Sequence, residues 1–167
     1  FLGVRHCVSC RVRKHLLRGL TGGVAAYKAA ELARLLTNDG MDVQAVMNEA
    51  ACRFVGTATL QALTGKHVFT DLWDASVANS MAHINLSRNV DVILIAPASA
   101  DFIAKLANGL ADDLLSTLCL ARDCPLLIAP SMNRQMWESH ATQRNLVTLP
   151  PHGPPLLSTP SGAPACV

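Results

Sequence analysis

The sequence predicts an α/β fold in which helices cover both faces of a single doubly wound parallel sheet. Two continuously apolar runs, Asp91–Ala96 and Pro125–Ala129, are typical of central parallel strands that are buried on both faces. Strand-like runs alternate with helical patterns along the chain, which predicts βαβ units and therefore three layers. The composition agrees, because 167 residues that are 50% hydrophobic and 16% charged suffice for one apolar core.

A glycine-rich turn joins the first strand and the first helix of the predicted domain. Leu16–Leu20 forms the expected first strand, and the turn Thr21–Gly23 follows it directly. Apolar residues at helical spacing then predict a helix over Val24–Thr37, which stops at the turn residues 38–40. The run Asp42–Met47 predicts the second strand.

The middle of the chain is less regular, and the alternation of strands and helices resumes after residue 90. Residues 49–64 predict two short helical pieces, and His67–Phe69 is a candidate edge strand. Beside the two central strands, we expect three further helices, over Ser99–Asn108, Ala111–Ala121 and Asn133–Asn145. We expect a last strand at Leu146–Leu149. This order predicts a flavodoxin-like or Rossmann-like architecture.

Both ends of the chain differ in composition from the predicted domain, which spans residues 15–149. Residues 1–14 form an expected N-terminal tail, in which Cys7 and Cys10 have C-x-x-C spacing. This pair is either half of a metal or redox site or incidental, and because no second pair follows at metal spacing we predict no metal site. Residues 150–167 contain six prolines, so they form either a functional flap or a disordered tail.

Charge and hydropathy narrow the range of functions. The net charge is +2 and the basic residues form no stripe with interleaved aromatic residues, which argues against nucleic-acid binding. No apolar run approaches the roughly 20 residues that span a bilayer, so we expect no membrane segment. Six cysteines in a chain of this size are typical of free thiols, and we expect a cytoplasmic protein.

Three loops carry the candidate binding residues, because ligands of open parallel sheets bind beyond the carboxyl ends of the strands. The loop Thr21–Gly23 opens a helix, where glycines and free N–H groups can hold a phosphate; the alternative is a glycine turn used for packing. The runs Leu94–Ser99 and Leu127–Met132 both contain an Ala-Pro-small strand exit. They either frame a slot for a planar ring or are ordinary strand exits.

Four single residues have both a structural and a chemical interpretation. Asn133 is a candidate helix N-cap, and Met136 lies one turn further on, where core packing is the common role. His83 is either a surface or satisfied polar histidine or a catalytic one. Cys166, in the proline-rich tail, is either incidental or a mobile thiol that closes over a site and donates a proton.

Five stretches of the sequence together carry a resemblance to one family of enzymes. They are Thr21–Lys28 (TGGVAAYK), His83–Leu86 (HINL), Ala96–Asp101 (APASAD), Asn108–Leu115 (NGLADDLL) and Pro130–Trp137 (PSMNRQMW). In this order they resemble the homo-oligomeric flavin-containing cysteine decarboxylases, and within them the bacterial phosphopantothenoylcysteine decarboxylase domains. The resemblance covers residues 15–149 and extends more loosely to residue 166.

The resemblance implies flavin mononucleotide (FMN) as the cofactor. The glycine loop, with Thr21, Gly22 and Gly23, would hold its phosphate. Asn48 stands where the family usually has Thr or Ser near this phosphate, and its side chain can still donate a hydrogen bond. The residues that the resemblance implies around the flavin are Pro97, Ala98, Ser99, Asp101 and Ser131.

The resemblance also implies the catalytic and substrate-binding groups. His83 would be the active-site histidine, Asn133 and Met136 would bind the substrate, and Cys166 would match the flap cysteine that protonates the intermediate. Oxidation of the CH₂–SH group beside the carboxylate to a thioaldehyde would provide the electron sink for loss of CO₂. Return of the electrons would then complete the saturated thiol with no net redox change.

The implied activity is that of a lyase that decarboxylates phosphopantothenoylcysteine to phosphopantetheine in coenzyme A biosynthesis. Two alternatives stay open: a peptidyl-cysteine oxidative decarboxylase, and a non-catalytic FMN-binding regulatory subunit of the same fold. The family implies a homotrimer or a higher homo-oligomer with the flavin at the subunit interface. Residues of two chains would then build each site.

Arg18 departs from the family pattern inside the predicted core. It lies in the first strand, at a position where the family is usually apolar. An unpaired charge in a buried strand costs several kcal/mol, so we expect this side chain to reach solvent or a partner.

Overall fold

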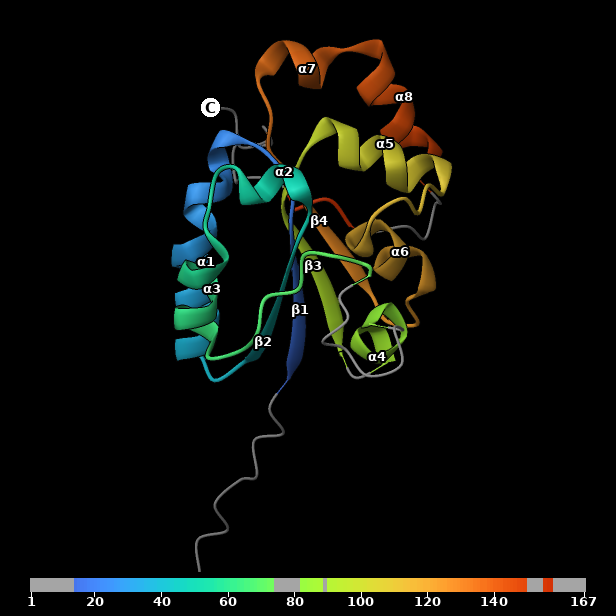
Figure 1. The fold of residues 1–167 in the computed structure, drawn as a ribbon. Helices are drawn as coiled ribbons and strands as arrows, with labels where there is room; N and C mark the ends of the chain where they lie inside the picture. The colour runs from blue at the N-terminus through green and yellow to red at the C-terminus, as the bar shows by residue number, and fades with distance from the viewer. Residues whose placement is uncertain (1–13, 74–81, 89, 150–154, 158–167) are drawn as a thin grey trace, which may run out of the picture.

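The chain folds around one parallel sheet of four strands. The computed structural model describes residues 14–73, 82–88, 90–149 and 155–157. Within them the strands have the order β2-β1-β3-β4 (Figure 1). All three neighbouring pairs are parallel, which confirms the predicted α/β class. The strands are β1 (His15–Leu20), β2 (Asp42–Met47), β3 (Val92–Ala98) and β4 (Leu126–Pro130).

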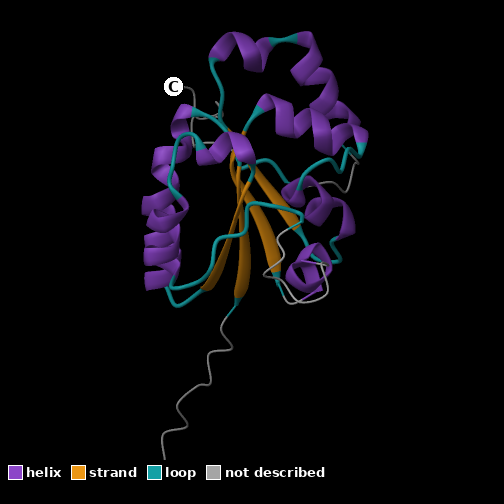
Figure 2. Cartoon of the chain, in the orientation of Figure 1, coloured by secondary structure: helices purple, strands orange, loops and turns teal. Residues whose placement is uncertain are grey.

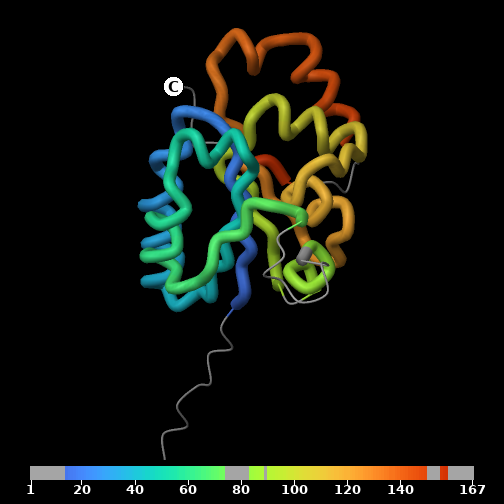
Figure 3. Tube along the Cα trace, viewed as in Figure 1, coloured from blue at the N-terminus to red at the C-terminus, as the bar shows by residue number. Residues whose placement is uncertain are grey.

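The order of the strands reverses between β1 and β3. From β1 the chain moves outward to β2, then returns past β1 to β3 and continues to β4, a path that the colours of Figure 3 follow. Loops that leave β1 and β3 therefore diverge to opposite sides of the sheet, and the crevice between them is the usual ligand site of this architecture.

Helices cover both faces of the sheet. Figure 2 shows α1 and α3 on one face, with α4, α5 and α6 on the other. The two last helices, α7 and α8, lie over α5 and contact it through α8. The helices are α1 (Tyr27–Asn38, preceded by the 3-10 turn Val24–Ala26), α2 (Glu49–Cys52), α3 (Thr57–Thr64), α4 (Ala82–Arg88), α5 (Ala100–Asn108), α6 (Leu114–Ala121), α7 (Arg134–Glu138) and α8 (His140–Thr148).

Side chains of each strand alternate between the two faces, and both faces are apolar. In β3, Ile93 and Ile95 pack into the core with α5 and α6, whereas Leu94 and Ala96 pack on the face that α1 covers. All four are at most 7% exposed. Burial on both sides explains why this strand reads as a continuous apolar run.

Capping residues set the bounds of α5 and α6, which lie close to the bounds predicted from the sequence. The Ser99 side chain accepts a hydrogen bond from the Phe102 N–H at the start of α5, and Gly109 ends that helix in the left-handed conformation. Asp113 and Ser116 form a capping box at the start of α6. The helix expected over Ser99–Asn108 is thereby confirmed, and the helix expected over Ala111–Ala121 is confirmed in type but begins only at Leu114.

The last predicted elements need correction. The helix expected over Asn133–Asn145 is two helices, because the backbone of Ser139 is extended between α7 and α8. The strand expected at Leu146–Leu149 is wrong, since residues 146–148 continue α8 and Leu146 packs against the core. A short apolar run does not distinguish a strand from a buried helix end. Leu156 instead forms a parallel bridge with Ile128 beside β4.

Two smaller expectations concern the segment between β2 and β3. The candidate edge strand His67–Phe69 amounts to one parallel bridge, which joins Phe69 to Val46. The helix α4, which carries His83, was not predicted from the sequence. The expected tails, residues 1–14 and 150–167, lie almost entirely outside the described residues.

Gly19 in β1 provides a test of how tightly this core is packed. A Cβ atom at this position would lie 2.5 Å from Ile95 Cδ1 and 2.6 Å from Leu115 Cδ1. We expect Gly19→Ala to lower the free energy of unfolding by about 1–3 kcal/mol through overpacking, measured by urea denaturation. Gly56→Ala is the control, because a Cβ there meets nothing within 4 Å. Equal stability of the two variants would contradict a tightly packed contact between β1, β3 and α6.

Candidate functional site

The Thr21 side chain joins the exits of β1 and β3. Its hydroxyl donates to the Pro97 carbonyl at 2.8 Å and accepts from the Ser99 N–H at 2.8 Å. Thr21 is fully buried, so both hydrogen bonds are shielded from water. The hydroxyl is therefore committed to holding two loops together, and its predicted role as a phosphate ligand would have to share the same oxygen.

The glycines after Thr21 allow the loop to pass close to its neighbours. A Cβ on Gly22 would lie 2.5 Å from the Ala50 Cβ, so this position leaves no room for a side chain beside α2. Gly23 has φ 154°, a conformation that side chains rarely adopt, and the space around its Cα is open. The backbone at Gly23 is thus accessible to a ligand that approaches the amino end of the first helix.

A pocket of about 270 Å³ opens where the exits of β1, β3 and β4 meet. Backbone and small side chains form most of its wall, which suits a planar ligand. None of the described residues that line it carries a charge. They are Gly22, Gly23, Val24, Ala25, Ser99, Ala100, Ser131, Met132, Asn133 and Met136.

The polar side chains of this pocket are held by helix caps and by the strand exits. Asn133 caps α7, where its Oδ1 accepts from the Met136 N–H at 2.9 Å. The Ser131 N–H donates to the Ala98 carbonyl at 3.0 Å, which ties the exits of β4 and β3 together. Met136 is 49% exposed, so it forms a rim of the pocket and not a core contact.

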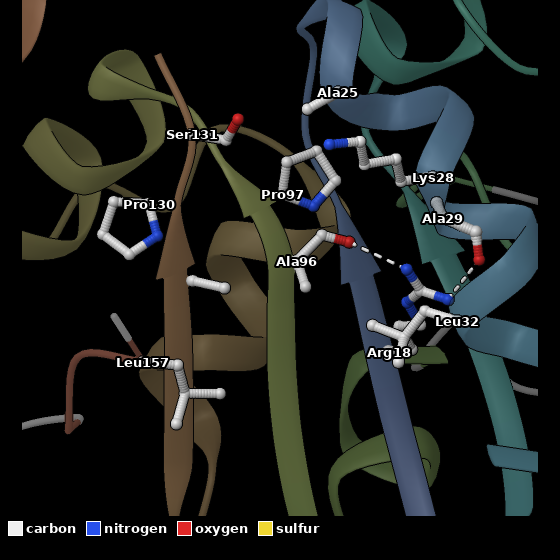
Figure 4. A pocket seen from close by; sticks show the side chains of 11 residues that line it. Arg18, Ala25, Lys28, Ala29, Leu32, Ala96, Pro97, Pro130, Ser131 and Leu157 are labelled. Atoms are coloured by element: carbon white, nitrogen blue, oxygen red, sulfur yellow. Dashed lines mark hydrogen bonds between the residues drawn. The ribbon is translucent and has the colours of Figure 1, made fainter. Parts of the chain in front are cut away.

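A second cavity of about 280 Å³ adjoins the first and shares Ala25 and Ser131 with it. It lies on the face of the sheet that α1 covers, and Figure 4 shows Arg18 and Lys28 as its charged lining groups. Its other walls are apolar and include Leu32, Pro97, Pro130 and Leu157. Lys28 was not predicted as a site residue from the sequence, although it is the last residue of the stretch Thr21–Lys28 that carries part of the resemblance.

Arg18 is buried in β1 and is only 1% exposed. The expectation that it reaches a partner is confirmed and the alternative, that it reaches solvent, is wrong. Its Nη1 donates to the Ala29 carbonyl of α1, and its Nη2 donates to the Ala96 carbonyl of β3 at 3.2 Å (Figure 4). Burial lowers the pKa of the guanidinium to about 10, which still leaves it charged near neutral pH.

Asn48 and Asp101 lie beside a different, strongly polar cavity of about 450 Å³. Asn48 caps α2 through a 2.9 Å hydrogen bond from the Ala51 N–H, so its Oδ1 is also engaged. Lys105 lies in the same cavity between Asp112 and Asp113, with N–O distances of 2.9 and 3.0 Å. Burial alone would lower its pKa, but the hydrogen bonds to the two carboxylates raise it to about 12. Asn48, predicted near the phosphate, and Asp101, predicted beside the flavin, thus line this cavity and not the glycine pocket.

His83 lies at the opposite edge of the sheet. It belongs to α4, which lies near the amino ends of the strands (Figure 1). Asn85 and Leu86 of this helix line a cavity with His15 and Asp42, the first residues of β1 and β2. The six residues of a strand such as β1 span roughly 20 Å, so His83 is remote from its own chain's pocket. Its Nδ1 is buried and has no hydrogen-bond partner among the described residues.

The remaining predicted site residues fall into two groups. Pro97 and Ala98 lie at the β3 exit, where the Ala96–Pro97 peptide bond is cis and Ala98 is fully buried. Cys166 lies outside the described residues, as do Cys7 and Cys10. In the part of the chain that is described, no group of three or more His, Cys, Asp or Glu side chains could hold a metal ion. None of the helices described there is long and apolar enough to cross a membrane.

Fold and site together define a doubly wound α/β protein with a ring-sized pocket at its topological switch point. The Flavoprotein family matches residues 7–161, and the chain belongs to this family. The Haemophilus influenzae coenzyme A biosynthesis bifunctional protein CoaBC is 49% identical over 153 residues, which are 92% of this chain and 38% of that protein. The chain therefore spans less than half of the length of this curated relative.

Solved structures give the same result. The FMN-dependent cysteine decarboxylase SpaF superposes with a TM-score of 0.79 at 35% identity, covering 86% of this chain and 82% of its own. A PPC decarboxylase variant in complex with pantothenoylaminoethenethiol superposes with a TM-score of 0.76 at 32% identity, covering 90% and 87%. The chain is thus similar in fold and sequence to decarboxylases over most of its length.

The Thr21 hydroxyl can be tested separately from the rest of the loop. Thr21→Val keeps the shape but leaves the buried Ser99 N–H without its acceptor, and should lower the free energy of unfolding by about 1–3 kcal/mol. Thr21→Ser retains the hydroxyl and should lose much less. Urea denaturation of both variants measures the difference, and equal losses would show that the hydrogen bonds of the hydroxyl contribute no more than the packing of the methyl group.

Proposed function

We propose that this chain binds FMN and decarboxylates phosphopantothenoylcysteine to phosphopantetheine. The observation that carries the proposal is the uncharged pocket at the β1–β3 crevice, in a chain that is 49% identical to CoaBC over 153 residues. A phosphate bound by backbone N–H groups and a flat ring between strand exits both suit such a pocket. The charged acid–base groups of the reaction must then come from outside the described lining.

The described residues fit FMN in size and chemistry. The two adjoining cavities, about 270 and 280 Å³, together offer the volume of a ring with its ribityl phosphate. Gly22 and Gly23 permit close backbone approach, and the amino end of α5 adds a positive dipole end next to Ser99. We propose the phosphate on this glycine side, because the neighbouring cavity around Lys105 holds four carboxylates, at Glu49, Asp101, Asp112 and Asp113.

The proposed mechanism divides the work between the cofactor and the chain. Bound FMN supplies reversible two-electron oxidation of the thiol-bearing carbon. Asn133 is placed to present its amide to the substrate at the pocket rim, with Met136 against the apolar part of the substrate. His83 would stand beside the substrate carboxylate, and Cys166 would return a proton to the reduced carbon. Small and apolar walls around Ser131 exclude water from the reacting atoms.

The position of His83 supports a site shared between two copies of the chain. This residue lies at the amino edge of the sheet, whereas the pocket lies at the carboxyl edge. A second copy that docks its α4 over the pocket would supply the histidine. A head-to-tail contact of this kind closes into a ring, and we propose a homotrimer or a higher homo-oligomer.

The other expected properties complete the proposal. Residues 15–149 would form the cofactor-binding domain, and residues 150–167 the flap that carries Cys166. The protein would act in the cytoplasm, where a reduced Cys166 thiol is stable.

Visible absorption of the purified protein tests the cofactor. We expect one FMN per chain, identified by mass after release, and CO₂ release when phosphopantothenoylcysteine is added. His83→Asn should abolish CO₂ release and retain FMN. Cys166→Ser should still release CO₂ but accumulate the unsaturated thiol. A protein that takes up no FMN would refute the proposal.

Mixing of inactive variants tests the shared site. His83→Asn and Asn133→Ala should each be inactive alone. Co-expressed in equal amounts, they should recover roughly a quarter of the parent activity, because random assembly places an intact His83 beside an intact Asn133 in one site of four. Each variant purified alone is the control. Absence of any recovery would show that one chain builds its own complete site.

A peptidyl-cysteine decarboxylase is the second candidate, favoured by the structural similarity to the peptidyl-cysteine decarboxylase EpiD, with a TM-score of 0.77 at 29% identity. A peptide that ends in cysteine, compared with phosphopantothenoylcysteine on the same preparation, separates the two activities. FMN binding without turnover of either substrate would indicate the third candidate, a non-catalytic regulatory subunit.

A further inference from the structure

We infer that Arg18 is a positioning residue for the cofactor pocket, and that it also supplies this pocket with a fixed positive charge. The inference rests on the proposed binding of FMN. Arg18 itself lies in the adjoining cavity, one layer beneath the strand exits. It thus acts on the cofactor through the backbone that it holds and through its charge.

The hydrogen bonds of Arg18 cross the crevice. One arm of the guanidinium donates to the Ala29 carbonyl of α1, and the other donates to the Ala96 carbonyl of β3. The helix that begins after the glycine loop and the strand that ends at Pro97 are therefore held by one rigid planar group. The residues next to these two elements form walls of the pocket, with Ala25 in the 3-10 turn before α1 and Ser99 directly after β3.

Burial of Arg18 costs free energy. The residue is 1% exposed, and among the described residues its Nε finds no hydrogen-bond partner and its guanidinium no carboxylate. A buried charge without a counter-ion loses its hydration, and an apolar side chain of similar size often gives a more stable protein. Leu16 and Leu20, its neighbours on the same face of β1, show that apolar side chains pack well there.

An anionic ligand would compensate the Arg18 guanidinium for the hydration that it loses on burial. Lys28 lines the same cavity, and the described lining contains no acidic residue, so the local potential is positive. Two-electron reduction of FMN at neutral pH leaves an anionic ring, whose charge a nearby cation stabilises. Arg18 should therefore bind the reduced cofactor more strongly than the oxidised one and raise the reduction potential of bound FMN.

The test compares Arg18→Met with the parent chain in three measurements. Flavin-free Arg18→Met should melt at the same temperature as the parent or higher. Its dissociation constant for FMN should rise about tenfold or more, by fluorescence titration. The reduction potential of its bound FMN should fall, by spectroelectrochemistry. Cofactor affinity thus falls while the stability of the flavin-free protein does not, which loss of a purely structural contact would not produce.

Two further variants make the result unambiguous. Arg18→Lys keeps the charge but cannot span both carbonyls, so it should weaken FMN binding while keeping most of the potential. Arg34→Met, on the exposed side of α1 where Arg34 pairs with Glu31, should change neither quantity. Arg18→Lys also carries the test if Arg18→Met does not fold.

The outcomes distinguish a failure of the proposed function from a failure of the role inferred for Arg18. A parent chain that binds no FMN refutes the proposed function, and the role of Arg18 with it. A parent chain that binds FMN, with Arg18→Met equal to it in affinity and potential, refutes the role of Arg18 alone. Loss of folding in both Arg18 variants would assign the residue to stability and would also overturn the inference.

Discussion

The tie between the exits of β1 and β3 is the contact on which the rest of the site depends. The Thr21 hydroxyl bonds both the Pro97 carbonyl and the Ser99 N–H, and both bonds are dry. Because the sheet reverses its order at this point, the two loops would otherwise leave in different directions. The tie sets the spacing between the glycine loop and the amino end of α5, and that spacing is the width of the pocket.

A second contact across the crevice is made by a charged side chain and not by a neutral hydroxyl. Arg18 bridges α1 and β3 directly beneath the Thr21 tie, with hydrogen bonds to two carbonyls. Below it the same face continues with apolar packing around Leu16 and Leu94. The polar group of this face, Arg18, thus lines the cavity, and the apolar side chains lie further along the sheet. This arrangement is typical of sites where local stability is exchanged for function.

The described pocket of one chain does not supply the acid–base groups that the proposed reaction needs. Its described lining offers hydroxyl, amide and thioether groups but no titratable side chain. The histidine that the resemblance singles out lies at the other end of the sheet. A second copy that brings its α4 to the pocket would supply this histidine, and it would also cover the exposed Val24 of the pocket lining.

The sequence by itself determined the buried strands, the glycine loop, the Ala-Pro-small exits and the helices α5 and α6, because these depend on hydrophobic period and local turn residues. It could not decide that residues 146–148 are helical, since a short apolar run fits either structure until a neighbour packs on it. Only the tertiary structure separated His83 and Asn48 from the glycine pocket, and only it gave Arg18 two carbonyl partners. Distances between residues far apart in the chain are set by packing of the layers, and no local pattern in the sequence encodes them.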